Sequence, residues 1–213
     1  MTRGTAIRAG ALASLAVLLL VVGAALRPVV VPEESVAEPV LSAAEIGFVQ
    51  DMAEHHQQAL AMTLRLAPDV DPAVAALARQ IGDTQRVEIG TLLGWLRLAD
   101  APPTNPRPMA WNIAPDHAGH DDSAAEPGAS MTGMASMAEL DALSAAHGRD
   151  AEVVFLQLML RHHLGGVEMA RAADALLVDG PVKQSARAAV QEQGGEIGLL
   201  TVMLAERGAT ALR

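Results

Sequence analysis

The feature that most constrains the fold of this chain is a pattern of methionine and histidine that occurs twice. The copies lie in residues 45–62 and 152–169, and their shared spacing gives two matching sets of side chains: Met52, His55, His56 and Met62, then Met159, His162, His163 and Met169. Because an α-helix turns about 100° per residue, each set falls within an arc of roughly 120° on one helix face. The repetition predicts a duplicated helical unit that points two methionine and histidine faces at one site.

Signals for helix ends divide the rest of the chain. Ser42-x-x-Glu45 and Ser136-x-x-Glu139 are capping boxes, which open helices. The segments Asp71-Pro72 and Asp179-Gly180-Pro181 each stop one helix and start the next. The predicted helices are residues 43–67, 72–98, 137–147, 149–178 and 181–207.

The repeat extends to the helix that follows each stripe, since Gln85-x-x-Glu88-Ile89 is echoed by Gln193-x-x-Glu196-Ile197. Apolar residues make up 51 % of the chain but aromatic residues only 2 %, so the core must be built from Leu, Val, Ala and Met. Good helix formers are abundant and strand-like alternation is scarce. We predict an all-α fold in which two repeated helical hairpins bury their stripes against each other as a four-helix bundle with pseudo-two-fold symmetry.

Three parts are expected along the chain. Residues 1–27 place two arginines before an apolar run and form a signal peptide or a membrane anchor, of which we favour the anchor because the run nearly fills a bilayer. Residues 28–41, rich in proline and glutamate, form an extended spacer. Residues 42–213 form the bundle domain. Its loop at about 100–135 is expected to be mobile and holds candidates for a metal-catching arm: His117, His120, Met131, Met134 and, just beyond it, Met137.

The composition excludes several classes of function. The formal net charge is −10, which disfavours binding to nucleic acid, because nucleic acid attracts clustered Lys and Arg. The chain has no cysteine, which excludes disulfides, iron–sulfur clusters, thiolate metal sites and Cys nucleophiles. No P-loop, dinucleotide-binding glycine turn or Ser–His–Asp order is present. Any soft metal must therefore be held by Met and His.

The two stripes have the chemistry of a metal site. Imidazole is a ligand for copper, zinc, iron and nickel, whereas thioether sulfur selects Cu(I), so copper is favoured over zinc. Glu88 and Glu196 are expected to accept hydrogen bonds from the histidines and to orient the rings. A di-iron centre is disfavoured, because such centres use Glu-x-x-His and here Met52 and Met159 stand three residues before the histidines.

Longer motifs surround each stripe. The first half contains Phe48-x-x-Asp51-Met52-x-x-His55-His56-Gln57-x-Ala59-x-x-Met62, and the second contains Met131-x-Gly133-Met134 and Phe155-Leu156-x-Leu158-Met159-x-x-His162-His163-x-Gly165-Gly166-x-x-Met169-Ala170. These motifs resemble the domain of unknown function 305 family, over roughly Ser42 to the C-terminus. The resemblance implies a ferritin-like four-helix bundle, export in bacteria and, as in some members, copper binding by the Met and His side chains of the two stripes.

We therefore expect an exported, extracytoplasmic protein that binds copper as a chaperone, buffer or store rather than as an enzyme. Its expected partner is a metal ion, and a membrane would be contacted through residues 1–27 if that segment is uncleaved. Two alternatives stay open. One is a helical interaction module of the cell envelope, with its histidines hydrogen-bonded to Glu88 and Glu196. The other is a redox enzyme at a His-rich copper centre.

Overall fold

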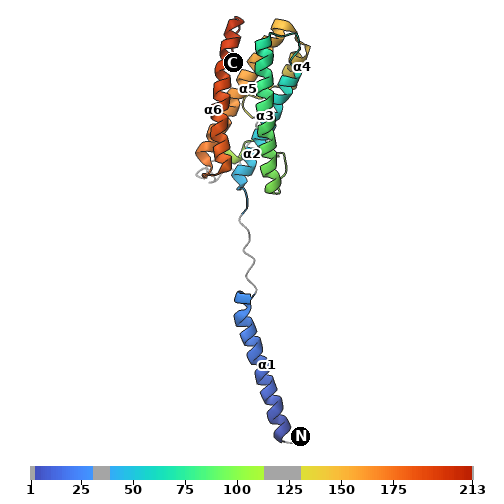
Figure 1. Cartoon of the computed structure of the whole chain (residues 1–213), viewed down its shortest axis with the longest axis vertical. Coiled ribbons are helices and arrows are strands. Elements are labelled where there is room, and N and C mark those ends of the chain that lie inside the picture. Colours follow the sequence, from blue (N-terminus) through green and yellow to red (C-terminus); the bar gives the residue numbers. More distant parts are fainter. Residues whose placement is uncertain (1–2, 31–38, 113–130, 213) are drawn as a thin grey trace, which may run out of the picture. The chain divides into compact units, whose positions relative to one another are not determined.

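The computed structural model of the chain describes residues 3–30, 39–112 and 131–212. These residues form helices and no strand, in the order α1 (Arg3–Val30), α2 (Ala43–Arg65), α3 (Pro72–Leu98), the 3₁₀ turn η1 (Ala110–Asn112), α4 (Met137–Ala145), α5 (Gly148–Leu176) and α6 (Pro181–Glu206) (Figure 1). The predicted all-α class is confirmed. The loop histidines His117 and His120 lie outside the described residues.

The chain divides into two compact units, residues 1–38 and 39–213. The first unit contains α1, which continues past the predicted boundary at residue 27 as far as Val30, so the predicted spacer begins inside a helix. The remaining spacer residues up to 38 lie outside the described part. Among the residues that the structure describes, no helix has both the length and the apolar character to cross a membrane.

The helices of the second unit begin where the capping signals predicted. Ser42 and Ser136 each complete a capping box with the glutamate three residues later. Asp71 caps α3 by accepting a hydrogen bond from the backbone N–H of Ala73. α3 ends at Leu98 as predicted, whereas α2, α4, α5 and α6 end one or two residues earlier than predicted. The early ends arise because the residues that follow α2, α4 and α5 already have extended backbone angles.

Two helical hairpins make up the second unit. α2 packs on α3 and α5 packs on α6, while α2 of the first hairpin also packs on α5 of the second (Figure 1). The two helices that carry the stripes therefore meet at the interface between the hairpins. The buried apolar side chains form two clusters, of which one contains Met52, Met131 and Met169 and the other contains Met62 and Met159.

The segment between the hairpins is packed onto the bundle at both of its described ends. The expected mobility of the loop at about 100–135 stays a prediction, because residues 113–130 lie outside the described part. At the first end, the buried carboxylate of Asp51 accepts hydrogen bonds from Trp111 Nε1 at 2.8 Å, from the Met109 backbone N–H at 2.7 Å and from Asn105 Nδ2 at 2.9 Å. Burial raises the pKa of Asp51, and these three donors oppose that rise. The Trp111 ring also packs edge-on against Phe48, with the ring centroids 5.4 Å apart.

Glu152 holds the opposite end of the bundle together. Glu152 lies in the second turn of α5, which begins at Gly148. Its carboxylate accepts hydrogen bonds from Arg207 Nε, just after α6, and from the backbone N–H of Asp71 at 2.8 Å. One buried carboxylate thus ties the start of α3 and the end of α6 to α5.

Candidate metal centre

The histidines of the two stripes meet in the middle of the bundle. The rings of His55, from α2, and His162, from α5, are stacked with their centroids 3.7 Å apart and their planes 32° from parallel. Both side chains are buried, with exposed fractions of 0 % and 1 %. The convergence of the two stripes, which the repeat predicted, is therefore observed. We call His55 and His162 the histidine pair.

The ring nitrogens of the histidine pair are unusual for buried polar atoms. Neither Nδ1 nor Nε2 of His55, and neither Nδ1 nor Nε2 of His162, has a hydrogen-bond partner among the described residues. Leaving a buried polar group unpaired costs about 1–3 kcal/mol, so such groups are rare unless they serve a purpose. Four unpaired nitrogen atoms in one stacked pair are compatible with a ligand that is not part of the protein.

Electrostatics keep the histidine pair uncharged. Burial lowers the pKa of His55 to about 3, with further lowering by His56 and His163, while the Thr132 backbone, which interacts with the ring but does not meet hydrogen-bond geometry, raises it. Burial, followed by the other three histidines, likewise holds the pKa of His162 well below its usual value. A neutral imidazole keeps one lone pair on a ring nitrogen, and this lone pair is what a metal ion binds.

The second histidine of each stripe has a carboxylate partner, as predicted. His56 Nε2 lies 3.0 Å from Glu88 Oε2, and His163 Nε2 lies 2.7 Å from Glu196 Oε2. Burial opposes ionisation of Glu88, but the hydrogen bond and charge of His56 outweigh it and leave the Glu88 pKa lowered. In both outer rings Nδ1 is buried and has no partner among the described residues. The outer histidines are therefore oriented by acids, whereas the inner pair is not.

The four methionines of the stripes lie on either side of the histidine pair. Met52 precedes His55 by about one turn of α2 and Met62 follows it by about two, and α5 repeats this order with Met159 and Met169. All four side chains are buried, with exposed fractions of 0–3 %. Met52 and Met169 belong to one apolar cluster and Met62 and Met159 to the other. The structure thus places a thioether-bearing cluster at each end of the pair.

Gly166 makes room for the histidine pair. It occupies the position of Ala59 in the first stripe, and a Cβ atom at Gly166 would lie 3.1 Å from His55 Cε1 and would collide with Gln193 Oε1. Gln193 is itself buried, and neither atom of its amide has a hydrogen-bond partner in the described chain. Glycine at position 166 lets the His55 ring and the Gln193 amide lie close to the α5 backbone.

A short segment that we call the strap, residues 131–135, lies across α5 beside the histidine pair. Gly133 of the strap has a φ of +84°, and a Cβ there would lie 3.1 Å from His162 Cα. The carbonyl of Thr132 sits against Gly165, where a Cβ atom would collide with it. Glycines on both sides therefore let two backbones come into direct contact, which larger residues would prevent.

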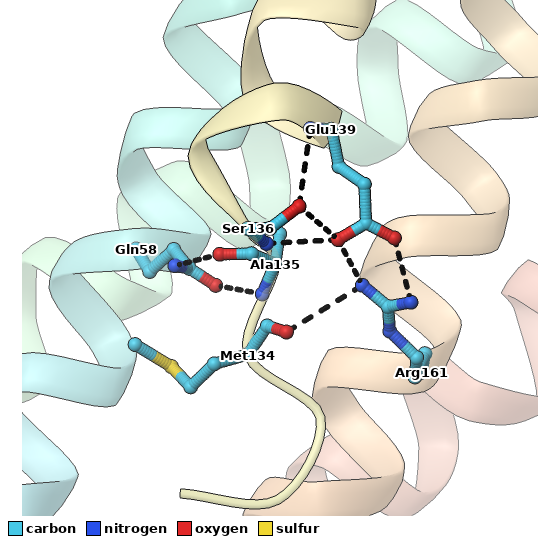
Figure 2. Close-up of polar contacts among 6 residues, drawn as sticks. All are labelled: Gln58, Met134, Ala135, Ser136, Glu139 and Arg161. Atoms are coloured by element: carbon cyan, nitrogen blue, oxygen red, sulfur yellow. Dashed lines mark hydrogen bonds and ion pairs between the residues drawn. The ribbon is translucent and has the colours of Figure 1, made fainter. Parts of the chain in front are cut away.

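Side chains of both stripe helices hold the strap in place (Figure 2). Gln58 of α2 donates to the Ala135 carbonyl at 2.9 Å and accepts from the Ala135 N–H at 2.6 Å. Arg161 of α5 forms two 2.8 Å hydrogen bonds with Glu139, whose pKa this contact lowers to about 2, and also reaches the Met134 carbonyl at 3.5 Å. Charge-assisted pairs of this two-pronged geometry are among the strong ones in proteins.

We predict that Gly165→Ala displaces the strap and destabilises the protein by about 2–3 kcal/mol, because a methyl group there overpacks against backbone that cannot rotate away. Gly194→Ala in α6 is the matched control, since a Cβ at that position meets nothing within 4 Å. The control should be stabilising by about 0.5–1 kcal/mol through helix propensity. Urea unfolding of both variants measures the difference, and equal effects would contradict the packing described for the strap.

The donor set fits a soft metal better than a hard one. Within residues 3–30, 39–112 and 131–212, no three His, Asp or Glu side chains cluster closely enough to hold an ion together. A site at the histidine pair would therefore combine imidazole nitrogen with thioether sulfur, which is the chemistry that Cu(I) prefers. The unpaired ring nitrogens and the buried methionines are compatible with that ion.

Several residues near the pair were not singled out from the sequence as part of a site. Gln85 and Gln193 were recognised as repeated, but their buried and incompletely paired amides could not be seen from spacing alone. Asp51 was seen only as part of a motif. The strap anchors Gln58 and Arg161 gave no signal, since exposed-looking polar residues on a helix are ordinary.

Comparison with known proteins gives a consistent result. The model of the DUF305 family, a domain of unknown function, matches residues 45–204. A Streptomyces coelicolor DUF305 protein that is proposed to be secreted has a crystal structure with 38 % sequence identity and a TM-score of 0.69, covering 80 % of this chain and 97 % of that one. A DUF305 fragment from Deinococcus radiodurans has 32 % identity and a TM-score of 0.62, covering 78 % and 97 %.

A more distant likeness is to CopM in its Cu(II)-bound form, with 21 % identity and a TM-score of 0.55, covering 76 % of this chain and 96 % of that one. At this identity the likeness concerns the fold. Comparison with curated protein sequences found no match. Because the family model spans most of the sequence and two solved family members are 32 % and 38 % identical, the chain belongs to the DUF305 family.

Proposed function

We propose that this protein binds copper at the histidine pair and acts as an extracytoplasmic copper buffer or chaperone. The observation that carries the proposal is the stack of two neutral, fully buried imidazoles whose ring nitrogens have no partner among the described residues. The distant neighbour CopM, which was solved with Cu(II) bound, adds support from a similar fold. Export fits the proposed secretion of the Streptomyces relative and the apolar N-terminal segment, as a cleaved signal or a retained anchor.

In this proposal the two hairpins form a ferritin-like four-helix bundle with the metal at its centre. His55 and His162 would hold the ion, and the stripe methionines Met52, Met62, Met159 and Met169 would supply thioether ligands from either side. Copper bound there would act as a soft acceptor of nitrogen and sulfur lone pairs. The protein excludes water from the pair and keeps both rings neutral, which removes competition from protons at neutral pH.

The outer histidines His56 and His163 would position the ligand set, since no three His, Asp or Glu side chains of the described residues cluster closely enough to hold an ion together. Their Nε2 atoms are engaged by Glu88 and Glu196, and their Nδ1 atoms remain available. Carboxylates that hold the far side of a ligating imidazole raise its basicity and fix its ring. The interaction-module alternative has the histidines bonded to Glu88 and Glu196, and the outer histidines do contact these acids. The inner pair has no such bond in the described chain, which favours the copper proposal.

An anaerobic competition titration of the full chain against a Cu(I) chelator tests the proposal. The double variant His55→Ala, His162→Ala is expected to weaken Cu(I) binding by at least about tenfold, the scale on which loss of groups around a metal acts. His147→Ala is the control, because the His147 side chain is 73 % exposed and lies 3.5 Å from Asp69, away from the stripes. Equal affinity in the wild type and the double variant would overturn the assignment of the site.

A further inference from the structure

A small pocket opens beside the strap, next to the point where it crosses α5. Its volume is about 110 Å³, enough for a few water molecules or one ion with part of its shell. The lining comes from η1 and the residue before it, from the strap and from α5: Met109, Asn112, Thr132, Gly165, Glu168, Met169 and Ala172. Two methionines, one asparagine and one glutamate are thus among the residues that line a single concavity.

The inner wall of the pocket is the backbone that covers the histidine pair. Thr132 and Gly165 line the pocket and are in direct contact with each other. The next residue along α5, Gly166, lies against His55, where a Cβ would be 3.1 Å from Cε1. The pocket and the pair are therefore separated by one thickness of backbone at the point where the strap crosses α5.

Met109 is held at the pocket by a strained backbone. Its φ is +64°, in the left-handed region that costs a residue with a side chain about 1–2 kcal/mol. The Met109 N–H donates to the carboxylate of Asp51 at 2.7 Å, so a buried acid of α2 holds this conformation. Backbone strain of this kind, at a residue whose side chain lines a concave surface, points to a role for that side chain.

We propose that this pocket is a port for a soft monovalent cation, at which Met109 and Met169 take up Cu(I) before it reaches the histidine pair. The inference rests on the proposed function and adds to it the route and a ligand, Met109, outside both stripes. Met109, which is half-buried, and Met169, which is buried, both line the pocket, and thioether ligands select a soft ion. Glu168, exposed at the same pocket, adds a negative charge that attracts the cation. Met169 is shared, since it lines the pocket and also belongs to the second stripe.

The port can be tested with Ag(I), which has the charge and softness of Cu(I) and does not change oxidation state. The full chain is labelled with ¹³C at the methyl groups of its 10 methionines, and Ag(I) is added stepwise while methyl and histidine ring signals are followed by NMR. The Met109 and Met169 methyl signals are expected to shift together with the first additions. Met109→Leu conserves volume and removes the sulfur, and it should slow the arrival of Ag(I) at the histidine rings by about tenfold.

Control variants separate the port from the centre. Met137→Leu, at a methionine that is 65 % exposed on α4 and does not line the pocket, should leave the rate unchanged. Glu168→Gln should slow uptake at low ionic strength without changing the fold, because the side chain is exposed. If the histidine and Met52 signals respond while the Met109 methyl does not, the port is wrong and the proposed function stands. If no signal responds, both are overturned.

Discussion

Acidification of the metal-free protein from about pH 6.5 to about pH 5 is expected to lower its free energy of unfolding by about 2 kcal/mol through His55 alone. The unfolded chain takes up a proton on this ring near pH 6.5, whereas the folded protein does so only near pH 3. Stability is therefore complete above pH 6.5 and is lost progressively as the pH falls towards 3. His162, whose pKa is also lowered by burial, adds to the loss in the same window.

Urea unfolding at several pH values in the presence of a chelator measures this dependence. The control is the double variant His55→Leu, His162→Leu, which should remove the contribution of the pair between pH 6.5 and pH 5. At pH 7 this variant should be as stable as the wild type or more stable, since it replaces unpaired buried nitrogens with apolar atoms. A wild-type protein whose stability does not change over this window would contradict the buried, neutral pair.

The combination of these results would distinguish a binding site from a structural core. A substitution that stabilises the metal-free protein and abolishes copper binding shows that the native residues are maintained at a cost to stability. The same substitution in a purely structural hydrogen-bond network would be destabilising, because partners would be left unpaired. The histidine pair has no such partners among the described residues. Its replacement is therefore expected to stabilise the metal-free protein and to abolish copper binding.

The all-α class and the helix starts could be predicted from the sequence because their strongest signals are local. Capping boxes at Ser42 and Ser136 and the Asp71-Pro72 pair fix helix starts through contacts within four residues. The duplicated stripe then required the two stripe helices to face each other, and the stacked His55 and His162 rings are the direct result. The pairing of the outer histidines with Glu88 and Glu196 also followed from matched spacing in the two halves.

The features that the sequence missed depend on contacts between distant segments that lack a repeat. Asp51 and Met109 are 58 residues apart, and Gln58 and Ala135 are 77 apart. Nothing in the spacing of either pair indicates that they meet. Gly165, which corresponds to Gln58 in the first copy of the repeat, shows the same limit. A glycine is needed there because the Thr132 carbonyl occupies the space that a side chain would fill. The two copies of the repeat thus differ in sequence where the strap contacts them.

The bundle can contain unpaired polar atoms at its centre because contacts at its ends stabilise it separately. The contact between Arg207 and Glu152 is expected to make the largest such contribution. The Arg207 and Glu152 side chains are about equally buried, at 9 % and 10 % exposure, and Arg207 also donates to the Met203 carbonyl at 2.9 Å. Arg207→Ala leaves the Glu152 carboxylate buried without its cation, which costs about 3 kcal/mol. For a domain of this size that corresponds to a fall of roughly 10 °C in Tm.

A matched control is Arg187→Ala, since Arg187 also joins α6 to α5 through an acid, Asp174, at 2.7 Å, but with its side chain 51 % exposed. Exposed pairs contribute about 1 kcal/mol or less, so the fall in Tm should be no more than a third of that for Arg207→Ala. Below its Tm, Arg207→Ala should bind Cu(I) with wild-type affinity, because the Arg207–Glu152 ion pair does not involve the histidines. Weakened Cu(I) binding in the folded variant would mean that this ion pair and the histidine pair are coupled. The ends of the bundle would then not act independently of the site between them.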